Sequence, residues 1–554
     1  MNRETIESRR SNSAGEKSAF MRRMGSAAGV WSAASILATT AEAKQPNVIF
    51  MLADDHTTEA LSCYGGRFSD VFQTPNLDRL ANEGVRFDQC IAVNSICTPS
   101  RASTLTGLRD FRSGTRTLQC ALDPSIPTYP SRFQAAGYQT ALFGKCHLYA
   151  EPQGFDQFAV TPKQGEYFDP KFIVKGTPYP PFRKSVSMFS LEPEKAAVLL
   201  KKGHSTDVVT DLALEWLEER DSSKPFLLEV HHKACHAPQD QYPERYADLL
   251  ADVTLPYPAS WGEDKSHRSD GSRLFGIQFR YPHPLRKGKM KEGVWHPEEM
   301  NEELLEKRRQ GITIPRQAAE ADYQKTVKGY LRLTKGIDDS LGRMLEYLER
   351  EGLLENTIIV YSADQGYFLG EHDYRDKRWM YEEAIRMPLL IRYPQKIRPG
   401  TVVSDTQVTN LDFAPTLLEL AGLPPMEQID GISFAELAAG GKKPVRDAVY
   451  YRYWMHLAHH GVPAHYGIRT PEYKLIFFYG LPLDAEGAIG GPTPAGWELY
   501  DLKKDPAEMH NIYDNPEYAG IVQKLKKQLA ELKQEVGDTD EQYPELLKRL
   551  AETP

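Results

Sequence analysis

The chain has 554 residues, 41% of them hydrophobic, which is enough for one large domain with a sizeable core and a second, smaller domain. A formal net charge of -9 argues against a nucleic-acid-binding protein, so no nucleic-acid partner is expected. The six cysteines include no Cys-x-x-Cys pair, which excludes the usual zinc-finger and thioredoxin patterns.

Residues 1–43 have the pattern of an export signal. The twin arginine Arg22-Arg23 precedes a weakly apolar run of small residues, and Ala41-Glu42-Ala43 supplies an A-x-A exit. We therefore expect a bacterial export signal, with the twin-arginine type as one option, and a periplasmic or extracellular protein. A disordered basic tail is the alternative. The apolar run is too short and interrupted for a stable membrane span.

Residues 44–444 alternate between strand and helix patterns. The runs "NVIFMLADD", "YQTALFGKCH", "PFLLEVHHKACH", "TIIVYSADQG" and "RMPLLIRYP" read as buried strands. The segments "TPNLDRLANEGV" and "ADYQKTVKGYLRLTKGIDDSLGRMLEYLEREG" read as amphipathic helices, the second as one helix or two. This alternation predicts an α/β domain whose large, mostly parallel sheet is sandwiched by helices.

Two further regions depart from this rhythm. Residues 257–318 are polar and basic without a clear period, which predicts an insertion; its basic residues could face an anionic substrate or simply be solvated. Residues 445–554 carry the aromatic runs "DAVYYRYW", "HYGIRT" and "YKLIFFYG", then the amphipathic segment "IVQKLKKQLAELKQEV". They predict a smaller C-terminal α+β subdomain with an antiparallel sheet and a packed helix.

Oxygen-bearing side chains follow two of the predicted strands. Asp54 and Asp55 end one strand, and Asp364 and Gln365 end another. Ligands bind at the carboxyl ends of parallel strands, and hard cations such as calcium or magnesium prefer carboxylate and amide oxygens. A metal site is one interpretation; a helix cap at Asp54 is the alternative, but it explains only one of the four residues.

Basic side chains end other strands or lie nearby. Gathered together, they would bind a tetrahedral oxyanion, either phosphate or sulfate. For Lys377 the alternative is a simple ion pair within "DKRWMYEE", and a lone histidine is more often structural than catalytic. The residues concerned are Arg101, Lys145, His147, His236 and Lys377.

The segment "ICTPSRAS" places Cys97 just before a predicted helix start and beside Arg101. Cys97 could be a thiolate nucleophile with a histidine base, a buried thiol, or half of a disulfide. None of these explains why Pro99, Ser100 and Arg101 follow at fixed spacing.

"CTPSR" followed by "ASTLTG" resembles the C-x-P-S-R signature of type I sulfatases, members of the alkaline phosphatase superfamily, in which the cysteine is oxidised to formylglycine. Other segments resemble the family in the same order: "LADDH", "TPNLDRLANEGVRFDQC", "GKCHL", "HHKACH", "SADQGYFLGEH", "DKRWMYEEAIRMPLLIR", "TNLDFAPTLLELAG" and "WELYDLKKDPAE". The resemblance implies a sulfatase that uses a formylglycine gem-diol nucleophile and calcium, and a formylglycine-generating maturase as a partner.

The same resemblance implies a role for each site residue. Asp54, Asp55, Asp364 and Gln365 would bind Ca2+ together with the converted Cys97. Arg101 and Lys145 would hold the formylglycine oxygens, and His147 would be the base of the second step. His236 and Lys377 would hold the sulfate, with His236 as a candidate general acid.

Two positions depart from the family pattern. "GKCHL" has Cys146 where the family generally has tryptophan, and "HKACH" has Cys235 where proline is common. Neither is an expected site group, and a disulfide between the two is a hypothesis.

The substrate is the least defined expectation. Several segments look closest to bacterial relatives of iduronate and N-acetylglucosamine-6-sulfatases, which implies a sulfated carbohydrate. His465, Tyr466 and Arg469 could reach over the pocket, although a surface salt bridge is an equal alternative for Arg469. Rival functions are a phosphate or phosphonate ester hydrolase of the same superfamily and a non-catalytic sulfated-glycan-binding protein.

Overall fold

The computed structural model describes residues 44–553, except 188–191, 284, 287–288, 292–293 and 297–298. The expected export signal, residues 1–43, lies outside this part of the chain. Residues Gln45–Pro554 form one compact unit. Among the described residues, no helix is both long enough and apolar enough to cross a membrane.

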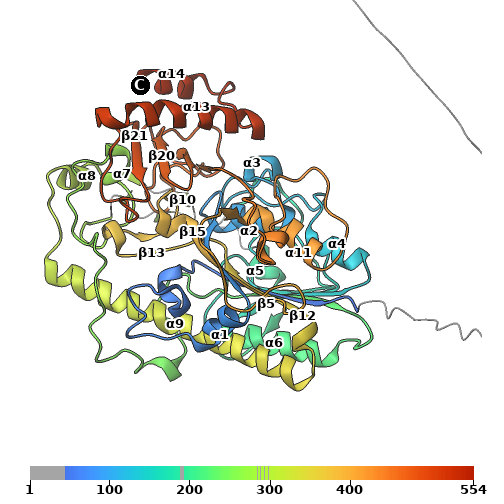
Figure 1. Ribbon diagram of the computed structural model, residues 1–554. Helices are drawn as coiled ribbons and strands as arrows, with labels where there is room; N and C mark the ends of the chain where they lie inside the picture. Colours follow the sequence, from blue (N-terminus) through green and yellow to red (C-terminus); the bar gives the residue numbers. More distant parts are fainter. Residues whose placement is uncertain are drawn as a thin grey trace, which may run out of the picture. The chain divides into compact units, whose positions relative to one another are not determined.

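A large mixed sheet forms the centre of this unit (Figure 1). Its middle strands are parallel, as the alternating pattern predicts, whereas β15 runs antiparallel to both of its neighbours. Across the sheet the strands are β16 (Thr401–Val403), β2 (Val85–Ile91), β15 (Arg386–Arg392), β12 (Thr357–Ala363), β1 (Asn47–Ala53), β7 (Phe226–His231), β3 (Gln139–Gly144), β4 (Gln157–Val160), β5 (Lys171–Val174) and β6 (Leu199–Leu200), with β17 (Val408–Thr409) also paired to β2.

Helices cover both faces of the sheet, as expected (Figure 1). One hydrophobic cluster packs alternate strand residues against α1 (Pro75–Glu83), α6 (Ser205–Glu219) and α9 (Arg316–Arg350). A second cluster packs the opposite face against α2 (Cys97–Thr106), α4 (Tyr129–Ala135), α11 (Phe413–Leu420) and α12 (Ala435–Ala438). The stretch predicted as one helix or two is the single helix α9, because its apolar stripe continues without a break from Tyr323 to Leu348.

Residues 257–318 hold little regular structure in their described part. They contain α7 (Asp270–Arg273), α8 (Glu302–Arg309) and the short strand pairs of β8 (Leu285–Arg286) with β11 (Glu299–Met300) and β9 (Lys289–Lys291) with β10 (Val294–His296). Two of the basic residues here are buried and structural. Arg268 donates to Glu263 and to the Tyr500 hydroxyl, and Arg308 donates to backbone carbonyls.

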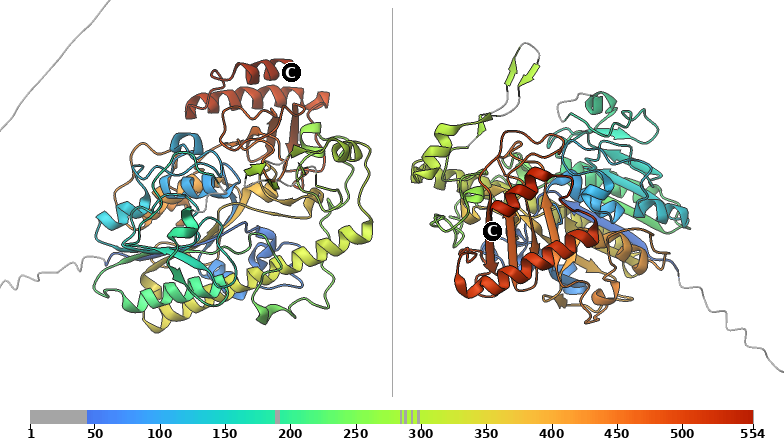
Figure 2. Two further views of the ribbon diagram at one scale, coloured as in Figure 1. Left: turned by 180° about the vertical axis from the view of Figure 1, so that it is seen from behind. Right: turned by 90° about the horizontal axis from the view of Figure 1, so that it is seen from above.

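The C-terminal residues form the predicted antiparallel sheet of β18 (Val449–Tyr453), β19 (His465–Arg469), β20 (Tyr473–Phe478) and β21 (Gly496–Asp501). Figure 2 shows α13 (Ala519–Val536) and α14 (Pro544–Glu552) lying over this sheet. The amphipathic segment forms α13, in which Leu525 and Leu529 are buried, and Ile521 and Leu532 are partly buried against the same core. The boundary near residue 444 stays a prediction.

Candidate active site

Two strand ends bring the predicted oxygen ligands together. β1 and β12 pair in parallel with Ala53 opposite Ala363, so the residues that follow each strand must lie side by side. The backbone N–H of Asp55 donates to Asp364 Oδ1 at 3.0 Å, and the Gln365 amide donates to Asp55. Asp54 accepts no helix-capping bond from η1 (Thr58–Ala60), which Thr57 caps instead.

The carboxylates of Asp54, Asp55 and Asp364 each offer an oxygen within 4.8 Å of the others, and all are fully buried. Gln365 Oε1 is also buried and has no hydrogen-bond partner among the described residues. Three clustered anions and an unpartnered amide oxygen form the donor set that a hard divalent cation prefers. The residues present therefore fit the expected calcium ion.

The charges of this cluster are unevenly compensated. Burial raises the pKa of Asp55 to about 7 even though Lys377 opposes the shift, and burial together with Asp54 raises the pKa of Asp364 to about 6. Burial also disfavours the charged form of Asp54, but Lys145 and other nearby cations have the larger combined effect. The pKa of Asp54 therefore falls well below its usual range. Clustered carboxylates that resist ionisation are those for which a bound cation is most favourable.

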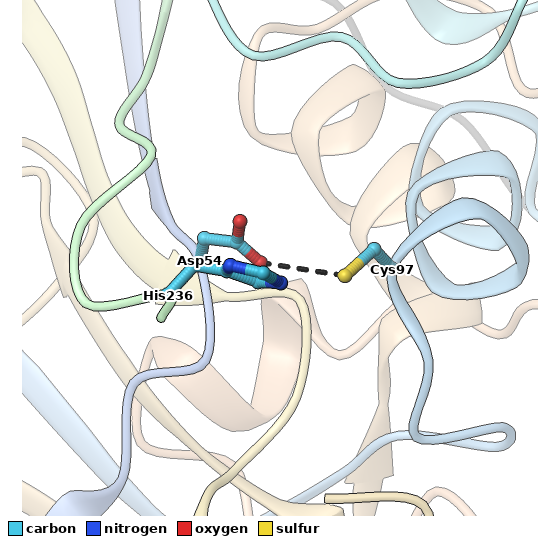
Figure 3. Close-up of side chains that lie close together, drawn as sticks. All are labelled: Asp54, Cys97 and His236. Atoms are coloured by element: carbon cyan, nitrogen blue, oxygen red, sulfur yellow. Dashed lines mark hydrogen bonds between the residues drawn. The ribbon is translucent and has the colours of Figure 1, made fainter. Parts of the chain in front are cut away.

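Cys97 is the first residue of α2, so it begins the helix that the sequence placed just after it. Its thiol donates to Asp54 Oδ1 at 3.5 Å (Figure 3). The sulfur also lies 3.7 Å from Lys145 Nζ. Burial raises the pKa of the thiol to about 12. An unmodified Cys97 is therefore protonated at neutral pH, and the thiolate alternative loses its support.

Arg101 follows Cys97 by one helical turn and reaches the same site. Its Nε donates to Asp364 Oδ2 at 2.8 Å, and Nη1 donates to the Lys145 carbonyl at 2.6 Å. Lys145 directly follows β3 and forms an ion pair with Asp54. Nη2 of Arg101 is buried without a hydrogen-bond partner among the described residues.

The remaining predicted cations enclose the other sides. Lys377 Nζ lies 2.5 Å from Asp55 Oδ2 but 3.9 Å from Asp376 Oδ1. Its main ion-pair partner is therefore Asp55, which lies outside "DKRWMYEE". His236 Nε2 lies 3.9 Å from Asp55 Oδ2, and Figure 3 shows its ring beside Asp54 and Cys97. Burial lowers the pKa of both His147 and His236 well below the usual value. Lys145 adds to this effect at His147, and Lys377 adds to it at His236.

Comparison with known proteins identifies the family. A model described as "Sulfatase" matches residues 46–423, and one described as "N-sulphoglucosamine sulphohydrolase, C-terminal" matches residues 370–535. The chain belongs to the sulfatase family. As a member of this family it is a sulfuric ester hydrolase.

Three individual matches extend over most of this chain and most of the matched chain. An N-acetylglucosamine-6-O-sulfatase of Bacteroides thetaiotaomicron is 38% identical over 528 residues, covering 90% of this chain and 88% of the relative. A solved structure in complex with its substrate D-glucosamine-2-N,6-O-disulfate has a TM-score of 0.76 and 37% identity, covering 90% of this sulfatase and all of that chain (100%). The phosphonate monoester hydrolase of Agrobacterium radiobacter, at 20% identity, TM-score 0.65 and coverage of 89% and 96%, shares the fold.

The three predicted substrate residues lie elsewhere in the sulfatase. Arg469 forms ion pairs with Glu382 and donates to Gln407, so its guanidinium already has protein partners. Tyr466 donates to Asp540 at 3.2 Å, and His465 is fully buried among aromatic rings. All three sit within β19, and none of these contacts is with Cys97 or with a carboxylate of the cluster.

The hypothesis of a disulfide between Cys146 and Cys235 is wrong, because both thiols are free. They belong to hydrophobic clusters on different faces of the large sheet. Cys235 instead contacts Thr334 Oγ1 at 3.2 Å.

Sequence reasoning missed a second group of polar residues beside the cluster. A cleft of about 510 Å³ is lined by Gln239, Asp376 and His460, and by Ala237 next to His236. His460 Nδ1 lies 2.9 Å from Asp376 Oδ2. Asp376 could have been found from the sequence, because it directly precedes Lys377. His460 lies far along the chain in "MHLAHHG", and nothing in the sequence marks it as a site residue.

Proposed function

We propose that this sulfatase removes the 6-O-sulfate of glucosamine units in a sulfated glycan, using a formylglycine made from Cys97 and a Ca2+ ion. The observation that carries this proposal is the convergence of buried carboxylates, Cys97 and four basic side chains at one sheet edge. The similarity to an N-acetylglucosamine-6-O-sulfatase supports the choice of sugar.

Conversion of Cys97 accounts for its setting. A buried thiol whose pKa is about 12 is a poor nucleophile, whereas an aldehyde hydrate supplies a hydroxyl that attacks sulfur and can later release sulfate. Because Cys97 is 1% exposed in the folded chain, we propose that a maturase reads "CTPSR" before folding is complete.

Asp54, Asp55, Asp364 and Gln365 would hold the Ca2+ ion, which supplies positive charge to polarise an oxygen of the sulfate or of residue 97. Lys145 and Arg101 hold the residue-97 end of the site, since Lys145 Nζ lies 3.7 Å from the thiol sulfur. Lys377 points in from the other side and neutralises charge on the transferring sulfate.

We assign different roles to His236 and His147. Nδ1 of His236 lies 2.8 Å from the Ala237 carbonyl, which only accepts, so Nδ1 carries a proton and Nε2 faces the site. A bound sulfate raises the pKa of His236 again, and Nε2 can then protonate the departing sugar oxygen. His147, whose pKa is lowered by burial and nearby cations, stays neutral and serves as the base.

The polar cleft beside Lys377 would receive the sugar. Asp376 and the partly exposed His460 offer an acceptor and a donor, which is how sites distinguish sugar hydroxyl groups. Tyr367 and Ile277 also line the cleft, and apolar and aromatic surfaces suit a sugar ring.

The test of the substrate is a desulfation panel with the matured enzyme. We expect release of sulfate from N-acetylglucosamine 6-sulfate and from glucosamine N,6-disulfate at least tenfold faster than from galactose 6-sulfate. Faster turnover of nitrophenyl phosphonates than of any sulfate ester would instead favour the phosphonate hydrolase. Tight glycan binding with no turnover by enzyme shown to carry formylglycine would favour the non-catalytic alternative.

The metal is tested by thermal unfolding of chelator-treated protein. Calcium at one hundred times its Kd should stabilise the wild type by about 2.7 kcal/mol. Asp364→Asn should lose this response, whereas Asp338→Asn, a buried carboxylate that accepts from the start of α1, should keep it. An equal calcium response in the Asp364 variant would contradict the assigned ligands.

We further propose that residues 1–43 direct export to the periplasm or the cell exterior. The twin arginine and the A-x-A exit support this proposal. Fractionation of cells that express the full chain should find it outside the cytoplasm, and Arg22→Lys with Arg23→Lys should retain it inside if the route is the twin-arginine type.

A further inference from the structure

The loop after β3 holds two residues in an unusual backbone conformation. His147 and Tyr149 have φ angles of 58° and 53°, in the left-handed region that favours glycine. Each such non-glycine residue costs about 1–3 kcal/mol and persists only where the surroundings impose it. Strained residues at a catalytic site suggest that the placement of their side chains matters.

This loop is anchored from both sides. Thr98, next to Cys97 in α2, donates its hydroxyl to the His147 carbonyl at 3.0 Å. The Leu122 N–H donates to the Leu148 carbonyl, also at 3.0 Å. The strain is therefore borne by fixed hydrogen bonds, and the loop places the ring of residue 149 beside the ring of residue 147.

The strained conformation produces one specific contact. The hydroxyl of Tyr149 lies 3.1 Å from Nε2 of His147, and the two rings are tilted with centroids 5.3 Å apart. Both side chains line a cavity of about 190 Å³ that also borders Tyr179. Nδ1 of His147 is buried and has no hydrogen-bond partner among the described residues.

The surroundings decide which ring nitrogen carries the proton. Burial raises the pKa of Tyr149 above its usual value, so its hydroxyl stays neutral and can accept a hydrogen bond. Burial lowers the pKa of His147, and Lys145, Arg101 and Lys377 lower it further, whereas Asp54 raises it. Nδ1 has no acceptor among the described residues, so a proton there would be buried without a hydrogen bond, whereas a proton on Nε2 can be donated to the Tyr149 oxygen.

We propose that Tyr149 is a positioning residue that accepts a hydrogen bond from Nε2–H of His147 and thereby keeps the lone pair on Nδ1. Nδ1 is then the atom that takes up a proton in the active site, while the Nε2 proton stays on the tyrosine oxygen. The assignment of His147 as a base rests on the proposed function; the fixed tautomer does not.

The first test reads the tautomer directly, on unconverted protein with histidine labelled by 15N. The His147→Gln variant assigns the signals by their loss. We expect wild-type His147 to be protonated on Nε2 alone, Tyr149→Phe to populate both tautomers, and the control Tyr179→Phe to match wild type. A wild-type proton on Nδ1, or an unchanged tautomer in Tyr149→Phe, would overturn the proposal.

The second test uses matured enzyme and a sulfate ester that the wild type turns over. Loss of the partner that orients a general base should lower kcat of Tyr149→Phe about 10- to 100-fold with KM within about twofold, and Tyr179→Phe should keep the wild-type values. An unchanged kcat, or a fall that follows KM alone, would contradict it. Should wild-type enzyme with formylglycine hydrolyse no sulfate ester, the proposed function fails, and the tautomer measurement still decides the role of Tyr149.

Discussion

The active site and the C-terminal subdomain both bury many charges, but they balance them differently. In the subdomain Arg452 lies 2.8 Å from Asp538 and 3.3 Å from Asp540, and Lys533 also pairs with Asp540. Each of these two buried aspartates therefore has a cation within reach. Buried pairs of this kind hold a fold together in the sense that removing one partner is costly.

At the carboxyl ends of β1 and β12, in contrast, the carboxylates of Asp54, Asp55 and Asp364 lie close to one another. Burial raises the pKa values of Asp55 and Asp364, and the Gln365 amide oxygen lacks a hydrogen-bond partner among the described residues. Such an arrangement contributes little to the stability of the fold and suits ligands that carry charge. Mutations in the two regions should therefore separate into effects on turnover and effects on folding.

The largest expected effect is on turnover. Cys97→Ala should reduce sulfate release at least about 10⁴-fold, since the nucleophile is lost, while the free energy of unfolding changes by about 1 kcal/mol. Steady-state kinetics and urea unfolding measure the two. Cys146→Ala, another fully enclosed thiol, is the matched control and should stay active. Near-wild-type turnover of Cys97→Ala would contradict a catalytic role for residue 97.

Arg452→Met should show the opposite pattern. It leaves Asp538 buried without its cation and Asp540 with Lys533 alone, which should cost about 3–5 kcal/mol of unfolding free energy, with kcat at 25 °C unchanged. Urea unfolding followed by circular dichroism gives the first quantity. A variant as stable as wild type would show that the subdomain charges are not structural.

His465 provides a pH-dependent version of the same contrast. Burial lowers its pKa to about 4, so between pH ~6.5 and pH ~4 the unfolded chain binds a proton that the folded chain does not. This contribution is complete above pH ~6.5 and is lost as the pH falls, at up to about 1.4 kcal/mol per pH unit.

His465→Phe, among Trp379 and Phe478, should remove that one proton from the acid dependence of stability and leave kcat unchanged. Unfolding free energies measured between pH 4 and 7 give the number of protons. An identical slope in variant and wild type would contradict a buried neutral histidine, and a lost activity would restore His465 as a substrate residue.

The smallest effect concerns substrate choice. His460→Ala should raise KM for N-acetylglucosamine 6-sulfate about 5- to 20-fold, the value of one or two hydrogen bonds, and leave nitrophenyl sulfate turnover nearly unchanged. Equal changes for both substrates would mean that His460 does not contact the sugar.

The sequence was informative where chemistry follows a strand. Asp54, Asp55, Asp364 and Gln365 each come directly after a buried apolar run, and parallel pairing of β1 with β12 then brings them together. The antiparallel direction of β15 was not readable, because a buried strand has the same apolar composition in either direction.

Pairings between distant residues were also beyond the sequence. Arg469 meets Glu382, and His460 meets Asp376, only after the subdomain packs on the main sheet. The sequence pattern therefore allowed a substrate role for Arg469 and gave no reason to assign one to His460. The left-handed backbone at Tyr149 left no signal, since tyrosine does not normally occupy it.

The central claim is that Cys97 is a precursor of the working group. Mass spectrometry of the proteolytic peptide that contains residue 97, from protein produced with a formylglycine-generating maturase, tests it most directly. If Cys97 is converted, the peptide is lighter by about 18 Da than the cysteine form, the change from thiol to aldehyde. Active enzyme whose peptide retains the unmodified cysteine would contradict it.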